Sequence, residues 1–225
     1  MARKILTEQE KKKRRKKRVI IVLILLVIIA IGSVFVYKNF FKKSNINAVE
    51  VKVLDSIDEY GYSLRETDSE LYKEEYQKLK DILLAEKIDE KEYATQVAKM
   101  FVIDLYSMST KINKYDIGGS EFYYNEKKKM YETKVMDTLY STLQDDTYGD
   151  RKQELPLVKA INVESTEDTT YKLDSKKVEA YLVKLTWEYE TDMKYDNEGS
   201  IVIAQEDGIR WSVVDFQPTL KPKYE

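Results

Sequence analysis

Residues 19–37 form an uninterrupted apolar segment, VIIVLILLVIIAIGSVFVY, that contains no charged side chain. As a helix rising about 1.5 Å per residue, this segment nearly matches the roughly 30 Å hydrocarbon core of a bilayer. A buried helix of a soluble domain is a poor alternative, because the segment has no polar face for solvent. The segment therefore predicts a transmembrane helix over residues 19–37.

Charge is distributed unevenly on the two sides of this segment. Residues 1–18 hold ten basic and two acidic side chains and sum to +8. Residues 44–225 hold 25 basic and 38 acidic side chains and sum to −13. The positive-inside rule places the basic stub in the cytoplasm and residues 44–225 outside the cell membrane.

Two alternatives concern the N-terminal region. Ala30 and Gly32 would suit cleavage of a signal peptide, but residues 34–37 continue the apolar run, which favours an uncleaved anchor; whether cleavage occurs stays open. The basic run 11–18 has no interleaved aromatic residues and no folded platform for a nucleic acid. We therefore expect membrane lipids, not nucleic acids, as its partner.

Composition excludes several classes of chemistry. The chain has no cysteine and no histidine, which excludes disulfide scaffolds, thiol nucleophiles, Ser-His-Asp triads and histidine or thiolate metal sites. We expect no cofactor and no metal. Acidic clusters at residues 164–168 and 192–198 lack the ligand spacing of an EF-hand calcium loop and are predicted to be solvated turns.

The outer region begins with a predicted juxtamembrane linker or stalk over residues 38–66. Val49, Val51 and Val53 alternate as in a short strand, so an edge strand is the alternative for part of it. Helical patterns follow over residues 67–143. A capping box at 67–70 and an acidic start at Asp89 predict two helices, and a third is expected from Tyr124 to Leu143.

After about Asp150 the apolar period changes from helical spacing to alternation. A first strand is predicted around residues 155–163. A long, half-solvated antiparallel strand over 178–190 and a hairpin over 201–216 follow. The sequence thus predicts an α+β domain over residues 67–217, three helices packed on a curved antiparallel sheet, and a tail over 218–225.

This order of elements resembles the nuclear transport factor 2-like superfamily over about residues 67–217. The architecture as a whole, with a short cytoplasmic head, one membrane span and an outer domain of this type, is similar to that of scaffold subunits of type IV secretion and conjugation machines. It is also similar to membrane-tethered domains of this fold in Gram-positive envelopes. The resemblance implies a cone-shaped fold, but it rests on no motif that transfers site residues.

Because such folds can enclose a pocket, two carboxylates are candidates for a catalytic base. Asp104 borders the apolar face of the second helix, and Asp215 alternates with Trp211 and Val213 on the last strand. Apolar surroundings would raise the pKa of either carboxyl group. The alternative is that each carboxylate reaches water or accepts a hydrogen bond at the edge of the core.

Three residues are candidates for an interaction surface: Tyr123, Tyr124 and Arg151. Arg151 lies in a polar connection between helix and sheet, and the alternative is that its side chain pairs with a neighbouring group. We expect a non-enzymatic interaction or scaffold module with a protein partner in the envelope or a second copy as partner. A small-molecule binder, or a hydrolase or isomerase, is the alternative. Binding of lipid or wall polymer is a third, which the net −13 disfavours unless a local basic patch intervenes.

Overall fold

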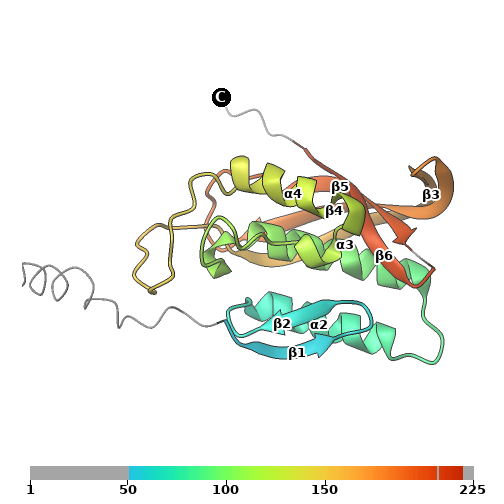
Figure 1. Cartoon of the computed structure of the whole chain (residues 1–225), viewed down its shortest axis with the longest axis horizontal. Coiled ribbons are helices and arrows are strands. Elements are labelled where there is room, and N and C mark those ends of the chain that lie inside the picture. Colours follow the sequence, from blue (N-terminus) through green and yellow to red (C-terminus); the bar gives the residue numbers. More distant parts are fainter. Residues whose placement is uncertain (1–50, 207, 220–225) are drawn as a thin grey trace, which may run out of the picture. The chain divides into compact units, whose positions relative to one another are not determined.

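The computed structural model describes residues 51–206 and 208–219 of the chain (Figure 1). The basic stub, the predicted membrane segment, the first part of the predicted stalk and the end of the tail lie outside the described residues. The chain divides into two compact units, Met1–Ala48 and Val49–Glu225, and the described residues belong to the second unit. None of the helices in its described ranges is both long and apolar enough to cross a membrane.

The described chain begins with a β-hairpin of β1 (Val53–Ile57) and β2 (Tyr62–Arg65). Tyr62 is buried in the main core, where its ring stacks on Phe122 with 5.0 Å between the ring centroids. The hairpin therefore belongs to the folded domain. The prediction of a linker or stalk over 38–66 is wrong for its described part, and the alternative of an edge strand holds there.

The first described helix, α2, spans Glu70–Leu83. Its cap is Ser69, whose Oγ accepts a hydrogen bond from the backbone N–H of Tyr72 at 3.1 Å. The capping box instead predicts Thr67 as the cap, and this prediction is wrong. Asp68 is the reason, because its carboxylate accepts the backbone N–H of Arg65 at 2.7 Å and thereby makes residues 65–68 a turn.

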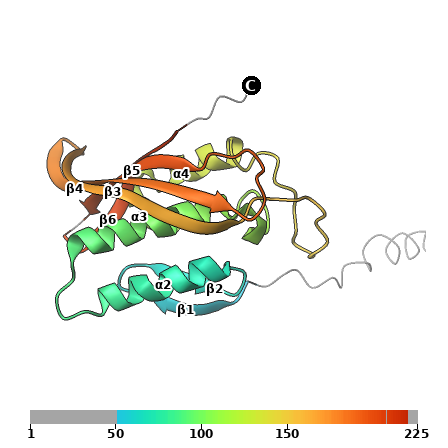
Figure 2. The ribbon, with the colours of Figure 1, turned by 180° about the vertical axis from the view of Figure 1, so that it is seen from behind.

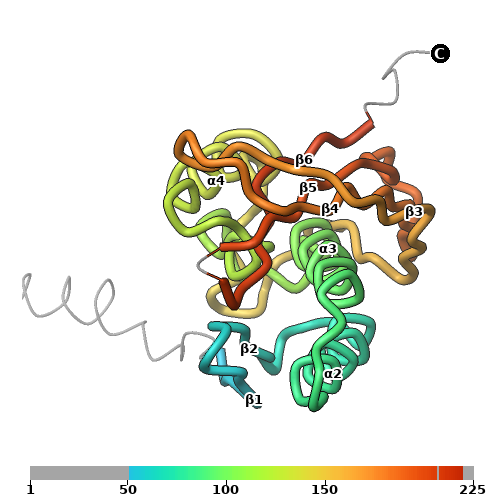
Figure 3. The backbone as a smooth tube through the Cα atoms, turned by 90° about the vertical axis from the view of Figure 1, so that its right-hand side faces the viewer, coloured from blue at the N-terminus to red at the C-terminus, as the bar shows by residue number. Residues whose placement is uncertain are grey.

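The second helix, α3, spans Glu90–Tyr106 and lies at the centre of the domain (Figures 2 and 3). Asp89 caps it as predicted, accepting the backbone N–H of Glu92 at 3.0 Å. The helix contacts α2 and all four strands of the larger sheet, and most of its residues are buried. Glu75 on α2 accepts an amide hydrogen bond from Gln96 on α3 at 2.8 Å, which ties the two helices together.

The third helix is shorter than predicted. Two short 3-10 turns, η2 (Met108–Thr110) and η3 (Ser120–Phe122), precede α4 (Asn125–Asp137). The predicted continuation toward Leu143 is a series of turns, in which Tyr140 and Leu143 are still buried in the core.

Four antiparallel strands in the order β3-β4-β5-β6 form the larger sheet. β3 (Val158–Leu173) and β4 (Lys176–Tyr189) pair along nearly their whole length. The acidic cluster 164–168 lies inside β3, so its prediction as a turn is wrong. The true turn is at Asp174 and Ser175, whose φ angles of 45° and 75° are left-handed.

β5 (Glu198–Glu206) and β6 (Arg210–Pro218) complete the sheet. One face of this sheet packs against the three helices and forms the main core with them. The alternating apolar residues of β4 lie on this face, as the sequence predicts. The other face carries a second cluster of five buried residues: Tyr124, Leu173, Ala180, Ala204 and Val214. The fold class is α+β, with three helices packed on a four-stranded antiparallel sheet.

Candidate functional site

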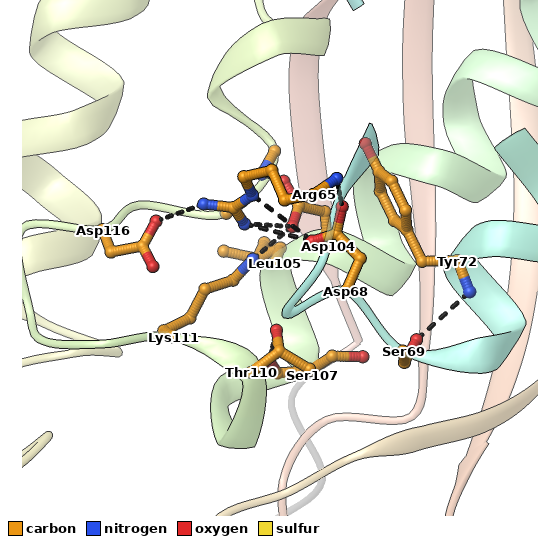
Figure 4. Close-up of polar contacts among 12 residues, drawn as sticks. Arg65, Asp68, Ser69, Tyr72, Asp104, Leu105, Ser107, Thr110, Lys111 and Asp116 are labelled. Atoms are coloured by element: carbon orange, nitrogen blue, oxygen red, sulfur yellow. Dashed lines mark hydrogen bonds and ion pairs between the residues drawn. The ribbon is translucent and has the colours of Figure 1, made fainter. Parts of the chain in front are cut away.

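A buried group of ion pairs surrounds Asp104 in the last turns of α3 (Figure 4). One carboxylate oxygen accepts a hydrogen bond from the ammonium group of Lys111. The other accepts a hydrogen bond from the backbone nitrogen of Gly119, with 2.6 Å between the nitrogen and the oxygen. Arg65 lies beside them, with Nη2 at 3.8 Å from the same oxygen that Lys111 contacts. The carboxylate of Asp104 is thus held from three directions.

Arg65 links this carboxylate to two others. The residue ends β2, and its guanidinium contacts Asp116 at 2.7 Å and Asp68 at 3.3 Å. Asp116 in turn accepts the backbone N–H of Ile112 at 3.1 Å. The group therefore joins β2, the start of α2, the end of α3 and the loop that follows it.

The pKa of Asp104 is lower than that of an ordinary aspartate. Burial alone would raise this pKa, but the charges of Lys111 and Arg65 outweigh it, together with the hydrogen bonds that Asp104 accepts from Lys111 and from the backbone N–H of Gly119. The expected raised pKa of a general base is therefore not found at Asp104. The pKa of Asp68, by contrast, is raised, mainly because of its burial.

Two glycines allow the loop after η2 to approach α3 closely. A Cβ at Gly118 would clash with the backbone carbonyl of Asp104 and lie 2.9 Å from the hydroxyl of Tyr140. Gly119 has a φ of 77°, and a Cβ there would lie 2.7 Å from the ring of Phe101. This close approach brings the N–H of Gly119 to the carboxylate of Asp104.

Asp215 lies on the face of the sheet that carries the second cluster, whereas α3, with Asp104, packs on the opposite face. Val213 pairs with Ile203 and Asp215 with Val202, so Val214 forms a bulge in β6. After the bulge the faces exchange, and Phe216 packs on the main core, 5.3 Å from the ring of Phe101. The expected alternation of Asp215 with Trp211 and Val213 is therefore wrong.

The guanidinium group of Arg151 joins three loop segments through hydrogen bonds. Its side chain is 6% exposed, and its guanidinium donates to the carbonyl oxygens of Lys111 at 2.7 Å, Ser109 at 2.9 Å and Gln144 at 3.3 Å. Asp146 lies 3.7 Å away. The structure thus gives Arg151 the local pairing that is the alternative to a recognition role.

The two candidate tyrosines, Tyr123 and Tyr124, pack against other side chains of the domain and do not extend into solvent. Tyr123 stacks on Tyr131 with 4.2 Å between ring centroids, at the edge of the main core. Tyr124 is buried in the second cluster, and its hydroxyl donates to Asp174 at 2.8 Å. Neither ring forms an open recognition surface in the described domain.

Sequence reasoning misses the partners of Asp104. Arg65 falls in the predicted connecting region, and neither Lys111 nor Asp116 stands out among the chain's many charges. One signal is present, since Gly118-Gly119 marks a loop that approaches another backbone closely. Within the described ranges, no three acidic side chains are grouped so that they would hold a metal ion.

A scan of family models, a search of curated proteins and a search of solved structures each return no match to the chain. The role of the domain is therefore inferred from its own sequence and geometry. The group around Asp104 brings three carboxylates and two cations together and joins four chain segments.

Proposed function

We propose that the chain is a single-pass membrane protein whose folded domain lies outside the cytoplasm as a non-enzymatic interaction or scaffold module. The apolar segment 19–37 supplies the anchor in this proposal, and the +8 stub supplies the cytoplasmic side. The domain begins at residue 53 with β1, which leaves 15 residues between the apolar segment and the fold.

The order of the described elements supports assignment to a nuclear transport factor 2-like domain. Helices α2, α3 and α4 come first, and a meander of four antiparallel strands follows. By this resemblance, the protein would be a membrane-anchored subunit of an envelope complex such as a secretion or conjugation machine. The two-stranded β1–β2 sheet is an addition at the N-terminal side of that arrangement.

One observation carries the interaction role: Val53 and Leu54 on β1 are 55% and 49% exposed. β1 pairs only with β2 among the described strands, and Leu54 lies at an irregularity in that pairing. Exposed apolar side chains on an edge strand suit contact with a protein partner. We therefore place the partner surface on β1, with a second envelope protein or a second copy as the partner.

The geometry offers less support for a hydrolase or isomerase. Both oxygens of Asp104 are occupied by Lys111 and by the N–H of Gly119, and its lowered pKa does not suit a general base at neutral pH. Asp215 lies after the bulge and its carboxylate accepts the side-chain amide of Gln217 at 2.8 Å. The two carboxylates do not converge on one site.

A photo-crosslinking amino acid placed at Leu54 in intact cells tests the proposal. We expect one defined protein adduct from position 54, reduced when Val53→Glu is added. The same group at Leu84, which is 73% exposed at the C-terminal end of α2, is the control and should not give that adduct. No protein adduct from position 54, or the same adduct from both positions, would count against a partner surface on β1.

A further inference from the structure

Four lysines lie at the tip of the β3–β4 hairpin and at the start of α4, beside the contact between these two segments. They are Lys127, Lys172, Lys176 and Lys177, named here the tip patch. Residues 126–127 and 172–177 contain two acids beside these four lysines, so the two segments together carry +2. The body of the chain carries −13, which makes this surface an exception to the overall charge.

Two contacts hold the two segments together. The hydroxyl of Tyr124, just before α4, donates to the carboxylate of Asp174 in the hairpin turn at 2.8 Å. The ammonium of Lys127 lies 5.8 Å from the centroid of the Tyr171 ring on β3. Because Tyr124 and Leu173 are also buried together in the second cluster, the tip has a fixed position against α4.

The positive charge of the tip patch is not neutralised within the described domain. Lys172 lies directly opposite Lys177 across the two strands, an arrangement of like charges that costs stability. No lysine of the tip patch forms an ion pair with an acidic side chain of residues 51–206 or 208–219. The three hairpin lysines are all exposed. Such a surface suits an external anion.

We propose that the tip patch binds an anionic polymer whose repeating unit carries a phosphodiester. Lysine ammonium groups bind phosphate oxygens as point charges, and several in one place act together. The −13 of the body repels a polyanion from the rest of the surface and thereby directs it to the tip patch. The envelope location of this ligand rests on the proposed outer placement of the domain, whereas the binding itself does not.

Binding of full-length protein in a neutral detergent to immobilised poly(glycerol phosphate) tests this proposal. The variant K172E/K176E/K177E removes the charge of the hairpin tip. The matched variant K87E/K114E/K152E makes the same change in net charge at three lysines outside the tip patch. We expect on the order of tenfold weaker binding for the tip variant and at most about a twofold change for the matched variant. Native binding should weaken as sodium chloride is raised.

Equal losses in the two variants would overturn the proposal, because net charge alone would then explain binding. So would an unchanged affinity of the tip variant. Weaker binding of the tip variant to phosphatidylglycerol in detergent micelles, with its binding to the polymer unchanged, would show a lipid-binding surface instead. If the charge reversal impairs folding, K172Q/K176Q/K177Q gives the same readout with neutral side chains. All of these measurements use isolated protein, so their failure leaves the topology of the chain to its own test.

Discussion

The ammonium group of Lys111 contacts the carboxylate of Asp104, and the Lys111 side chain is wholly withdrawn from solvent. Burial of a lone ammonium or carboxylate costs several kcal/mol, so each charge needs the other. The pair joins the last turns of α3 to the loop after η2. It therefore acts on the stability of the domain, and its effect is measurable by unfolding.

Lys111→Met should destabilise the domain by about 3–5 kcal/mol, because it leaves the carboxylate of Asp104 with one fewer cation in a buried place. Lys114→Met, a change of the same type outside the buried group, should cost under about 0.5 kcal/mol. Urea unfolding of the full-length protein in neutral detergent gives both values. Similar stabilities for the two variants would show that the pair does not hold the fold.

Gly119→Ala should destabilise the domain more than Gly149→Ala does. Both glycines have left-handed φ angles, 77° and 69°, so both substitutions carry a backbone cost of about 1–2 kcal/mol. A Cβ at Gly119 also meets the ring of Phe101, whereas nothing lies within 4 Å of one at Gly149. We expect about 1–3 kcal/mol of additional loss at Gly119. Equal losses would show that the loop can move away from α3.

Stability should fall in acid because of Glu75. Burial raises its pKa, but hydrogen bonds from Lys78, Lys99 and Gln96 more than offset burial and leave the folded-state pKa below the ordinary value. The unfolded chain then binds more protons near pH 4, so this stabilisation is present above the unfolded pKa and is lost as pH falls through the folded pKa. Glu75→Gln should make the acid loss shallower, as measured by urea unfolding across pH 2.5–7 at about half-unit steps.

Glu121 provides the comparison with the opposite sign. Burial raises its pKa, so its contribution to stability is present below the unfolded pKa and is lost as pH rises through the folded pKa. Glu121→Gln removes this opposing contribution and should make the acid loss steeper. If both variants changed the pH profile in the same direction, the assigned pKa directions would be wrong for one of them.

Tyr124→Phe should loosen the hairpin tip without unfolding the domain. It removes the hydroxyl that donates to Asp174 while the ring stays in the second cluster. We expect a loss of about 1 kcal/mol and faster amide exchange over residues 172–177. Tyr195→Phe, for which the structure gives a ring contact with Tyr189, is the matched control. Unchanged exchange at the tip would contradict the proposed fixed position of the hairpin.

Long periodic segments could be predicted because their faces differ strongly in polarity. The central helix is capped by Asp89 as predicted, and the alternation along β4 gives its buried face correctly. The α+β class follows from the order of these elements. The hairpin β1–β2 could not be assigned securely, since its place in the core depends on Tyr62 meeting Phe122, far away in sequence.

The errors have local physical causes. A bulge at Val214 changes which side of β6 faces the helices, and no apolar pattern announces a bulge. The cap of α2 lies at Ser69 and not at Thr67, because the carboxylate of Asp68 accepts the backbone N–H of Arg65. Spacing alone does not decide between these two hydroxyl residues. The charged group around Asp104 depends on contacts between residues that are distant along the chain. Of this group, only Asp104 and the close-approach glycines are visible in the sequence.

The proposed topology has a direct test, because the chain contains no cysteine and each introduced thiol is therefore unique. Asp150→Cys lies on an exposed loop of the domain, and Glu10→Cys lies in the basic stub. A membrane-impermeant maleimide applied to intact cells, with the outer wall made permeable to the reagent, should label position 150 at once and position 10 only after lysis. Labelling of position 10 but not position 150 in intact cells would contradict an outer domain.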